Sequence, residues 1–133
     1  MLQEIAGLPN FLLYLAVSIG MLVVFLGAYV FATPQHELPL IRQGNVSASI
    51  VFGGTIVGFA LPIASAVANS VSLVDLLVWG AIACIVQVLA SMLLRLIIHD
   101  LRKHIEEDRI SVAITMASLK FAMGLLNAAA IVY

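Results

Sequence analysis

The chain of 133 residues is 63% apolar and only 10% charged. Soluble domains are about half apolar and about one quarter charged, so this composition excludes a water-soluble globular protein. Six basic and seven acidic residues give a net charge of −1, which offers no basic surface and excludes nucleic acid as a partner. The sequence predicts an integral membrane protein whose first partner is the lipid bilayer.

Four stretches are long and apolar enough to cross a membrane as helices. About 20 helical residues span the roughly 30 Å of hydrocarbon in a bilayer, whereas barrel strands are shorter and alternate in polarity. We therefore expect an all-α fold, a four-helix bundle in a single membrane domain over residues 1–133. Glu4 and the long apolar run after it argue against a cleaved signal peptide. The predicted spans are residues 8–31, 46–68, 73–98 and 110–132.

Local signals mark the ends of these helices. Pro34 and Pro39 follow the first span and cannot continue a helix. Ser72 with Asp75 three residues later is typical of a capping box, which predicts the start of the third span. Asp108 is predicted to cap the fourth span in a similar way.

Basic residues predict the orientation of the chain, because lysine and arginine resist translocation across the membrane. Apart from Lys120, all of them lie in the connections after the first and third spans or at the adjoining helix ends. These two loops are therefore predicted to be cytoplasmic in a multi-pass protein of the bacterial inner membrane, with both termini periplasmic or extracellular. The residues concerned are Arg42, Arg95, Arg102, Lys103 and Arg109.

The connection over residues 95–108 spaces apolar residues among charges at helical intervals. It contains no Pro or Gly, so the third helix is predicted to run on beyond the membrane. This extension either lies against the lipid headgroups or docks a cytoplasmic or membrane protein. The candidate docking residues are Arg102, Lys103, Glu106 and Glu107.

The two halves of the chain resemble each other at an offset of 64 residues. Residues 41–50 lie over residues 105–114, with Ile, Ser and Ile at matching positions. The same offset lays the first span on the third and the second on the fourth. We predict two tandem repeats of one orientation, at about 8–70 and 72–133, related by an axis along the membrane normal. A chance match over so short a segment is the alternative.

Together with this repeat, the segment at residues 44–58, Gly-Asn-Val-Ser-Ala-Ser-Ile-Val-Phe-Gly-Gly-Thr-Ile-Val-Gly, resembles a known group. It is similar to the YjfL-type bacterial inner-membrane proteins, a family of unknown function (DUF, number 350). The resemblance extends over essentially the whole chain. The other positions that carry it are Thr33-Pro34, Pro62, Asp75, Trp79-Gly80, Gln87 and Asn127-Ala128.

What the resemblance implies is a small polytopic protein of the bacterial inner membrane. Genes of this family often lie beside those of phage-shock-like membrane-stress proteins and of ATP-grasp ligases similar to glutathionylspermidine synthase. The family has no established catalytic or ligand-binding residues, so none is transferred to this chain. Lys120 departs from the family pattern, which tends to have a small residue there.

Lys120 lies near the middle of the fourth span, where a lysine costs about 2.5 to 3.5 kcal/mol. It shares a helical stripe with small residues and Asn127, so it is predicted to face protein or a wet cavity. Gln87 and Thr55 lie at a similar depth, whereas no carboxylate is expected there. These four residues are the candidate ligand or ion path. The alternative is a lysine that snorkels, with Gln87 as a bond between helices.

Five glycines are predicted to let helices approach closely, within one chain or between copies. They are Gly53, Gly54, Gly58, Gly80 and Gly124. Tyr14, Tyr29 and Trp79 near the helix ends are interpreted as anchors at the membrane surface.

The sequence offers no set of residues for catalysis. The spans contain no Ser/His/Asp set, no paired carboxylates and no phosphate loop. The pairs His36-Glu37 and His99-Asp100 have no standard ligand spacing, and the single Cys84 cannot bind zinc alone. We therefore expect no enzyme, no cofactor and no metal site.

Two functions stay open. The first is a non-enzymatic, oligomeric scaffold or partner-docking component in membrane stress or envelope homeostasis. The second is a small channel or transporter, also a homo-oligomer because one four-helix chain is small for a pore, with a polar station at mid-membrane.

Overall fold

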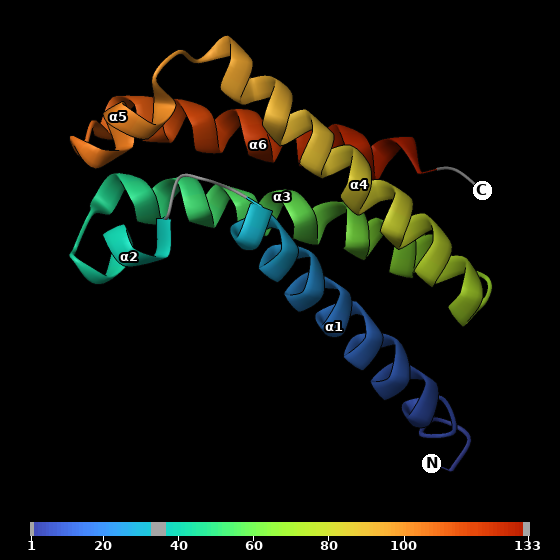
Figure 1. The fold of residues 1–133 in the computed structure, drawn as a ribbon. Coiled ribbons are helices and arrows are strands. Elements are labelled where there is room, and N and C mark those ends of the chain that lie inside the picture. The colour runs from blue at the N-terminus through green and yellow to red at the C-terminus, as the bar shows by residue number, and fades with distance from the viewer. Residues whose placement is uncertain (1, 33–36, 132–133) are drawn as a thin grey trace.

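The fold is built from six helices, as the computed structural model describes them for residues 2–32 and 37–131. Four long helices are joined by a tight turn and by two connections that each hold a short helix (Figure 1). Thr33, Pro34 and His36 lie outside the described residues. In chain order the helices are α1 (Leu8–Ala32), α2 (Glu37–Arg42), α3 (Val46–Asn69), α4 (Leu73–Ile97), α5 (Leu101–Glu106) and α6 (Ile110–Ala130).

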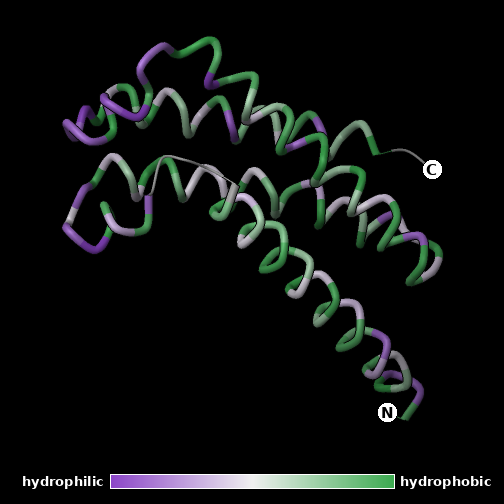
Figure 2. Tube along the Cα trace, viewed as in Figure 1, coloured by the Kyte–Doolittle hydropathy of each residue, from purple (hydrophilic) through white to green (hydrophobic). Residues whose placement is uncertain are grey.

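The long helices α1, α3, α4 and α6 are the four candidate membrane spans. They begin at the predicted residues and end within two residues of the prediction, so the all-α fold of four spans is confirmed. The predicted end of the last span, at residue 132, lies outside the described residues. Figure 2 shows the apolar residues along the four spans and the polar ones gathered around α2 and α5. The start of α1 and the end of α6 lie at the end opposite to α2 and α5 (Figure 1).

The centre of the bundle is a parallel pair formed by α3 and α6. At one end the Asn45 side chain donates to the carbonyl of Ile105 over 2.8 Å, and at the other Ser65 donates to the carbonyl of Ala128 over 2.6 Å. The residue numbers of the bonded partners rise together from one end of the pair to the other, so α3 and α6 run in the same direction.

Small residues permit this close approach. A Cβ added to Gly54 would lie 2.7 Å from the Cα of Ala117, and one added to Gly124 would lie 2.8 Å from the Cα of Gly58. Such distances are too short for carbon atoms that are not bonded, so the backbones themselves are in contact. Gly80 faces the side chain of Met21 on α1, whereas Gly53 has open space where its side chain would be.

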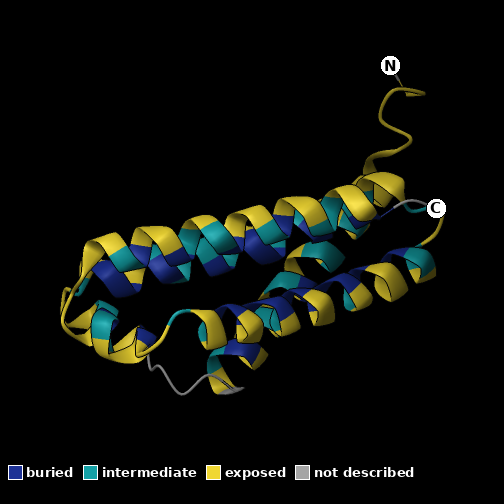
Figure 3. Cartoon of the chain, turned by 90° about the horizontal axis from the view of Figure 1, so that it is seen from above, coloured by how far each residue is buried: buried dark blue, intermediate teal, exposed yellow. Residues whose placement is uncertain are grey.

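The helices α1 and α4 lie on the outside of this pair. Buried residues line the inner faces of the helices, and the outer faces are exposed (Figure 3). Of the four spans α1 is packed least: only 6% of its most apolar stretch is buried, against 39% for α3. Its apolar surface therefore faces lipid or another protein.

The predicted extension of the third span is wrong. The helix α4 ends at Ile97, and α5 begins at Leu101 after a break in which Asp100 has φ 56°. Asp tolerates this left-handed conformation better than most residues. The reversal buries Leu101 and Ile105, at 4% and 1% exposure, against α3 and α6. The apolar side of α5 thus packs on the protein and not on the headgroups.

The prediction that Ser72 begins the third span is confirmed, but the capping box is only half formed, since the Asp75 carboxylate accepts the backbone N–H of Val71. Ser72 accepts the backbone N–H of Asp75 at the start of α4, over 3.1 Å. The prediction for Asp108 is wrong. The residue in the N-cap position of α6 is Arg109, without a side-chain cap. Asp108 instead accepts the backbone N–H of Ser47, over 2.8 Å, and so caps α3 together with Asn45, which accepts from Ala48.

The predicted internal repeat stays a prediction, although the element bounds agree with it. The first residues of α2 and α5 are 37 and 101, and those of α3 and α6 are 46 and 110. Both pairs differ by the 64 residues that the sequence match gives.

We expect Gly54→Ala to lower the free energy of unfolding by about 1 to 3 kcal/mol, because the new methyl group meets the Ala117 backbone. Gly53→Ala is the matched control, since it adds the same group where nothing lies within 4 Å. It is expected to leave stability within about 1 kcal/mol of the wild type. Unfolding in detergent measures both. Equal effects of the two variants would contradict the close contact of α3 with α6.

The cap from Asp108 predicts a dependence of stability on pH. The Ser47 N–H bond holds the pKa of the Asp108 carboxyl below its ordinary value. The ionised form is therefore favoured in the folded state, and its contribution is present above about pH 4 and lost as the pH falls through the lowered pKa. We expect Asp108→Asn to be less stable than the wild type at pH 7 and equally stable at the low-pH limit. A difference that persists at low pH would show another role for this carboxylate.

Candidate functional site

A cluster of polar side chains lies inside the bundle, around the amine of Lys120 on α6. Lys120 is 1% exposed. Its Nζ donates to the hydroxyl of Tyr29 over 2.5 Å and to that of Thr55 over 2.7 Å. Thr55 in turn donates to the carbonyl of Val51, over 3.1 Å. The amine is thus held by hydroxyl groups from α1 and α3, which offset part of the cost of its burial.

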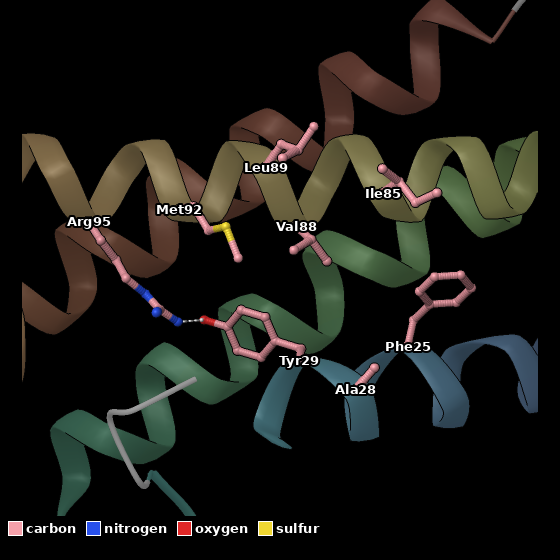
Figure 4. A pocket seen from close by; sticks show the side chains of 8 residues that line it. All are labelled: Phe25, Ala28, Tyr29, Ile85, Val88, Leu89, Met92 and Arg95. Carbon is pink, nitrogen blue, oxygen red and sulfur yellow. Dashed lines mark hydrogen bonds between the residues drawn. The ribbon is translucent and has the colours of Figure 1, made fainter. Parts of the chain in front are cut away.

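Tyr29 connects this lysine to a second cation. The Tyr29 ring is 4% exposed and packs edge-on against Phe59, with ring centroids 5.9 Å apart. Its hydroxyl also accepts from Nη2 of Arg95 on α4, over 3.1 Å (Figure 4). The Lys120 Nζ and the Arg95 Cζ lie 4.7 and 5.5 Å from the ring centroid, so both cations interact with the ring itself. The interpretation of Tyr29 as a surface anchor is therefore wrong.

A carboxylate from the connection after α1 interacts with this cluster. Glu37, the first residue of α2, is 5% exposed. Burial raises the pKa of the Glu37 carboxyl, against the opposing charges of Lys120 and Arg95. Its Oε1 has no hydrogen-bond partner among the described residues. Sequence analysis assigned Glu37 to a loop. No pattern in the neighbouring residues predicts the short helix α2 or the burial of this side chain.

The other two residues of the candidate path join helices through the backbone. The Gln87 amide of α4 donates to the carbonyl of Lys120, over 3.2 Å, and not to its amine. The Asn127 amide of α6 donates to the carbonyl of Ala83, over 2.8 Å. Thr55 and Gln87 are each 2% exposed. Within one chain, protein atoms thus fill the space around Lys120, Thr55 and Gln87.

Grooves on the outside of the bundle are apolar. One of about 240 Å³ lies between α1 and α4 and ends at Tyr29 and Arg95 (Figure 4). Two others, of about 300 and 360 Å³, lie between α1 and α3 along residues such as Ser18 and Val67. A fourth, of about 320 Å³, lies over Gly53 and Gly54.

The candidate docking residues lie on the exposed side of α5 and just after it. Arg102 and Glu106 form an ion pair of 3.0 Å, and Glu107 pairs with Arg109 over 2.9 Å. Lys103 is exposed on the same helix.

Residues that could bind a metal ion do not gather in the described part of the chain. No three His, Cys, Asp or Glu residues group there. Cys84 is buried in the apolar core.

We expect Tyr29→Phe to lower the free energy of unfolding by about 1 to 3 kcal/mol, because it keeps the ring but removes the oxygen that accepts from Lys120 and Arg95. Tyr14→Phe on the same helix is the control, since Tyr14 is only partly buried. In a Lys120→Met background the loss is expected to shrink, because the buried amine that donates to Tyr29 is gone. Additive losses would show that Tyr29 and Lys120 are not coupled.

Comparison with known proteins agrees with this architecture. Residues 3–131 match the family model described as Domain of Unknown Function (DUF350). Over 123 residues the chain is 34% identical to "UPF0719 inner membrane protein YjfL" of Escherichia coli (strain K12), covering 92% of this chain and 93% of the relative. The protein of the same description from Escherichia coli O157:H7 matches equally. No solved structure matches.

Proposed function

We propose that this chain, which belongs to the DUF350 family of inner-membrane proteins, is a non-enzymatic scaffold that docks a protein partner at its α2–α5 end. The partner is a cytoplasmic or membrane protein of an envelope or membrane-stress system. The chain acts as a homo-oligomer. Its termini face the periplasm, and the α2–α5 end faces the cytoplasm.

The observation that carries this proposal is the fixed position of the charged helix α5. The buried side chains of Leu101 and Ile105 fasten α5 to the bundle, and the Asn45 amide holds the Ile105 carbonyl. The exposed side of α5 therefore presents its charges in one arrangement. A surface that is already ordered loses little entropy when it binds a partner.

Stability does not explain these charges. Arg102 and Glu106 have side chains that are 56% and 48% exposed, and such surface pairs contribute about 0 to 1 kcal/mol. Charges of both signs on a fixed surface instead favour recognition, because they attract a partner of complementary pattern and repel others.

The orientation and the oligomer rest on different features. Basic residues, from Arg42 to Arg109, collect at the α2–α5 end, which supports a cytoplasmic location. The span α1 packs least against the rest of the chain, with 6% of its most apolar stretch buried, and this leaves its surface open to a second copy or to lipid. A mass measurement in nanodiscs tests this: a single copy per disc at all protein concentrations would exclude the oligomer.

A second candidate, an oligomeric channel or transporter, is favoured by Glu37. A buried carboxylate near Lys120 is the kind of group that could couple transport to protons. Within one chain Lys120 is 1% exposed, so a path past it requires a rearrangement or a second copy. Proton flux in proteoliposomes that Glu37→Gln abolishes would favour this function over the scaffold.

Site-specific photo-crosslinking in living cells tests the docking surface. With a photoreactive residue at Glu107, we expect a discrete adduct with a second protein. The double variant Arg102→Glu/Lys103→Glu is expected to remove at least 90% of it. Arg102→Lys/Lys103→Arg, which keeps both charges, is the matched control and is expected to retain it.

The same photoreactive residue at Val71, which is 86% exposed at the opposite end of the bundle, controls for random contact. An adduct at Glu107 that equals the one at Val71, or that survives charge reversal, would exclude α5 as the docking surface.

A further inference from the structure

The groove between α1 and α4 is apolar along its length and polar at one end, as a phospholipid is. Its wall is apolar along most of its length, with Phe25 from α1 and Val88 and Met92 from α4. Its polar groups, the Tyr29 hydroxyl and the Arg95 guanidinium, meet at one end (Figure 4). A single apolar molecule with an anionic group at one end matches this pattern.

The depth of the groove in the membrane agrees with such a molecule. Arg95 lies two residues before the end of α4 at Ile97, which is close to the headgroup level. From there the wall follows α4 back to Ile85, about 15 Å toward the middle of the bilayer at 1.5 Å per residue. An acyl chain that enters from the leaflet at the α2–α5 end runs in the same direction.

The charge at this end favours an anion. The Arg95 guanidinium lines this end of the groove, and the Lys120 amine lies behind it on the same Tyr29 hydroxyl. Among the described residues, Glu37 is a carboxylate that interacts with both. The bond to Tyr29 fixes the guanidinium at the end of the groove. Guanidinium groups bind phosphate oxygens through parallel N–H bonds, and a positive residue near the membrane surface attracts anionic lipid by about 1 kcal/mol.

We propose that this groove is a binding site for an anionic phospholipid, with one acyl chain along α4 and the phosphate at Arg95. A free phosphate shares the headgroup chemistry, but it would leave the apolar length of the groove unused. The site is independent of the docking surface on α5.

The grooves between α1 and α3 provide an internal comparison. They have similar or larger volumes, about 300 and 360 Å³, but no Lys, Arg, Asp or Glu lines them. They are accordingly expected to contact acyl chains without preference for a headgroup.

Native mass spectrometry of the full chain tests the proposal. The purified protein is given equal amounts of phosphatidylglycerol and phosphatidylcholine in detergent, and the lipid retained on the protein is counted. We expect phosphatidylglycerol to exceed phosphatidylcholine about fivefold, the ratio for 1 kcal/mol. Arg95→Gln is expected to bring this ratio to about one, and Arg95→Lys to keep most of it. Equal retention by the wild type would overturn the proposal.

Two further comparisons of variants distinguish binding in the groove from attraction by general surface charge. Ala28→Trp fills the α1–α4 groove and is expected to abolish retention, whereas Ala64→Trp fills an α1–α3 groove and leaves it unchanged. Arg102→Gln, on the exposed side of α5, is likewise expected to have no effect. Retention that Ala28→Trp leaves intact would exclude the groove, even if Arg95→Gln failed to fold.

A competition distinguishes the lipid from its headgroup. Excess glycerol phosphate is expected not to displace phosphatidylglycerol, because the acyl chain supplies most of the contact. Displacement would show that the site selects a soluble anion and would overturn the assignment to lipid.

Discussion

The packing of the helices in this chain depends on the contacts of one buried amine, that of Lys120. No single helix can supply partners for Lys120, so they come from other helices. Tyr29 of α1 and Thr55 of α3 accept from its amine, and Glu37 of α2 interacts with it electrostatically. An amine that is expensive in hydrocarbon thus specifies how the other helices are placed around α6, since any other arrangement would leave it without its acceptors. The cluster gives α1, which is otherwise loosely packed, a fixed point of contact.

The close contact of α3 with α6 makes this arrangement possible. Where Gly58 and Gly124 lie, the two backbones touch, and the carbonyl of Lys120 accepts the amide of Gln87 across that contact. A side chain at Gly58 would occupy the position of the Gln87 amide. The glycines therefore serve two needs: they bring the helices together, and they leave room for the polar bond that joins α4 to the pair.

The sequence predicted what depends on local pattern and missed what depends on distant contacts. Hydropathy predicts the four spans, and the spacing of Ser72 and Asp75 predicts a cap, because both signals lie within one helix. The burial of Glu37 and the break before α5 could not be predicted, since both result from packing against segments far away in the chain. Lys120 was recognised because a lysine within a membrane span is costly in free energy. Tyr29, its main acceptor, resembles an ordinary interfacial tyrosine near a helix end.

The bond between Asp108 and Ser47 also has a consequence for biogenesis. The carboxylate that caps α3 is 61 residues further along the chain, so the ribosome adds it after α3 has been synthesised. At 5 to 20 residues per second this interval lasts about 3 to 12 s. During that time α3 has only Asn45 at its N-terminus. The second cap of α3 can therefore form only after most of the second half of the chain has been made.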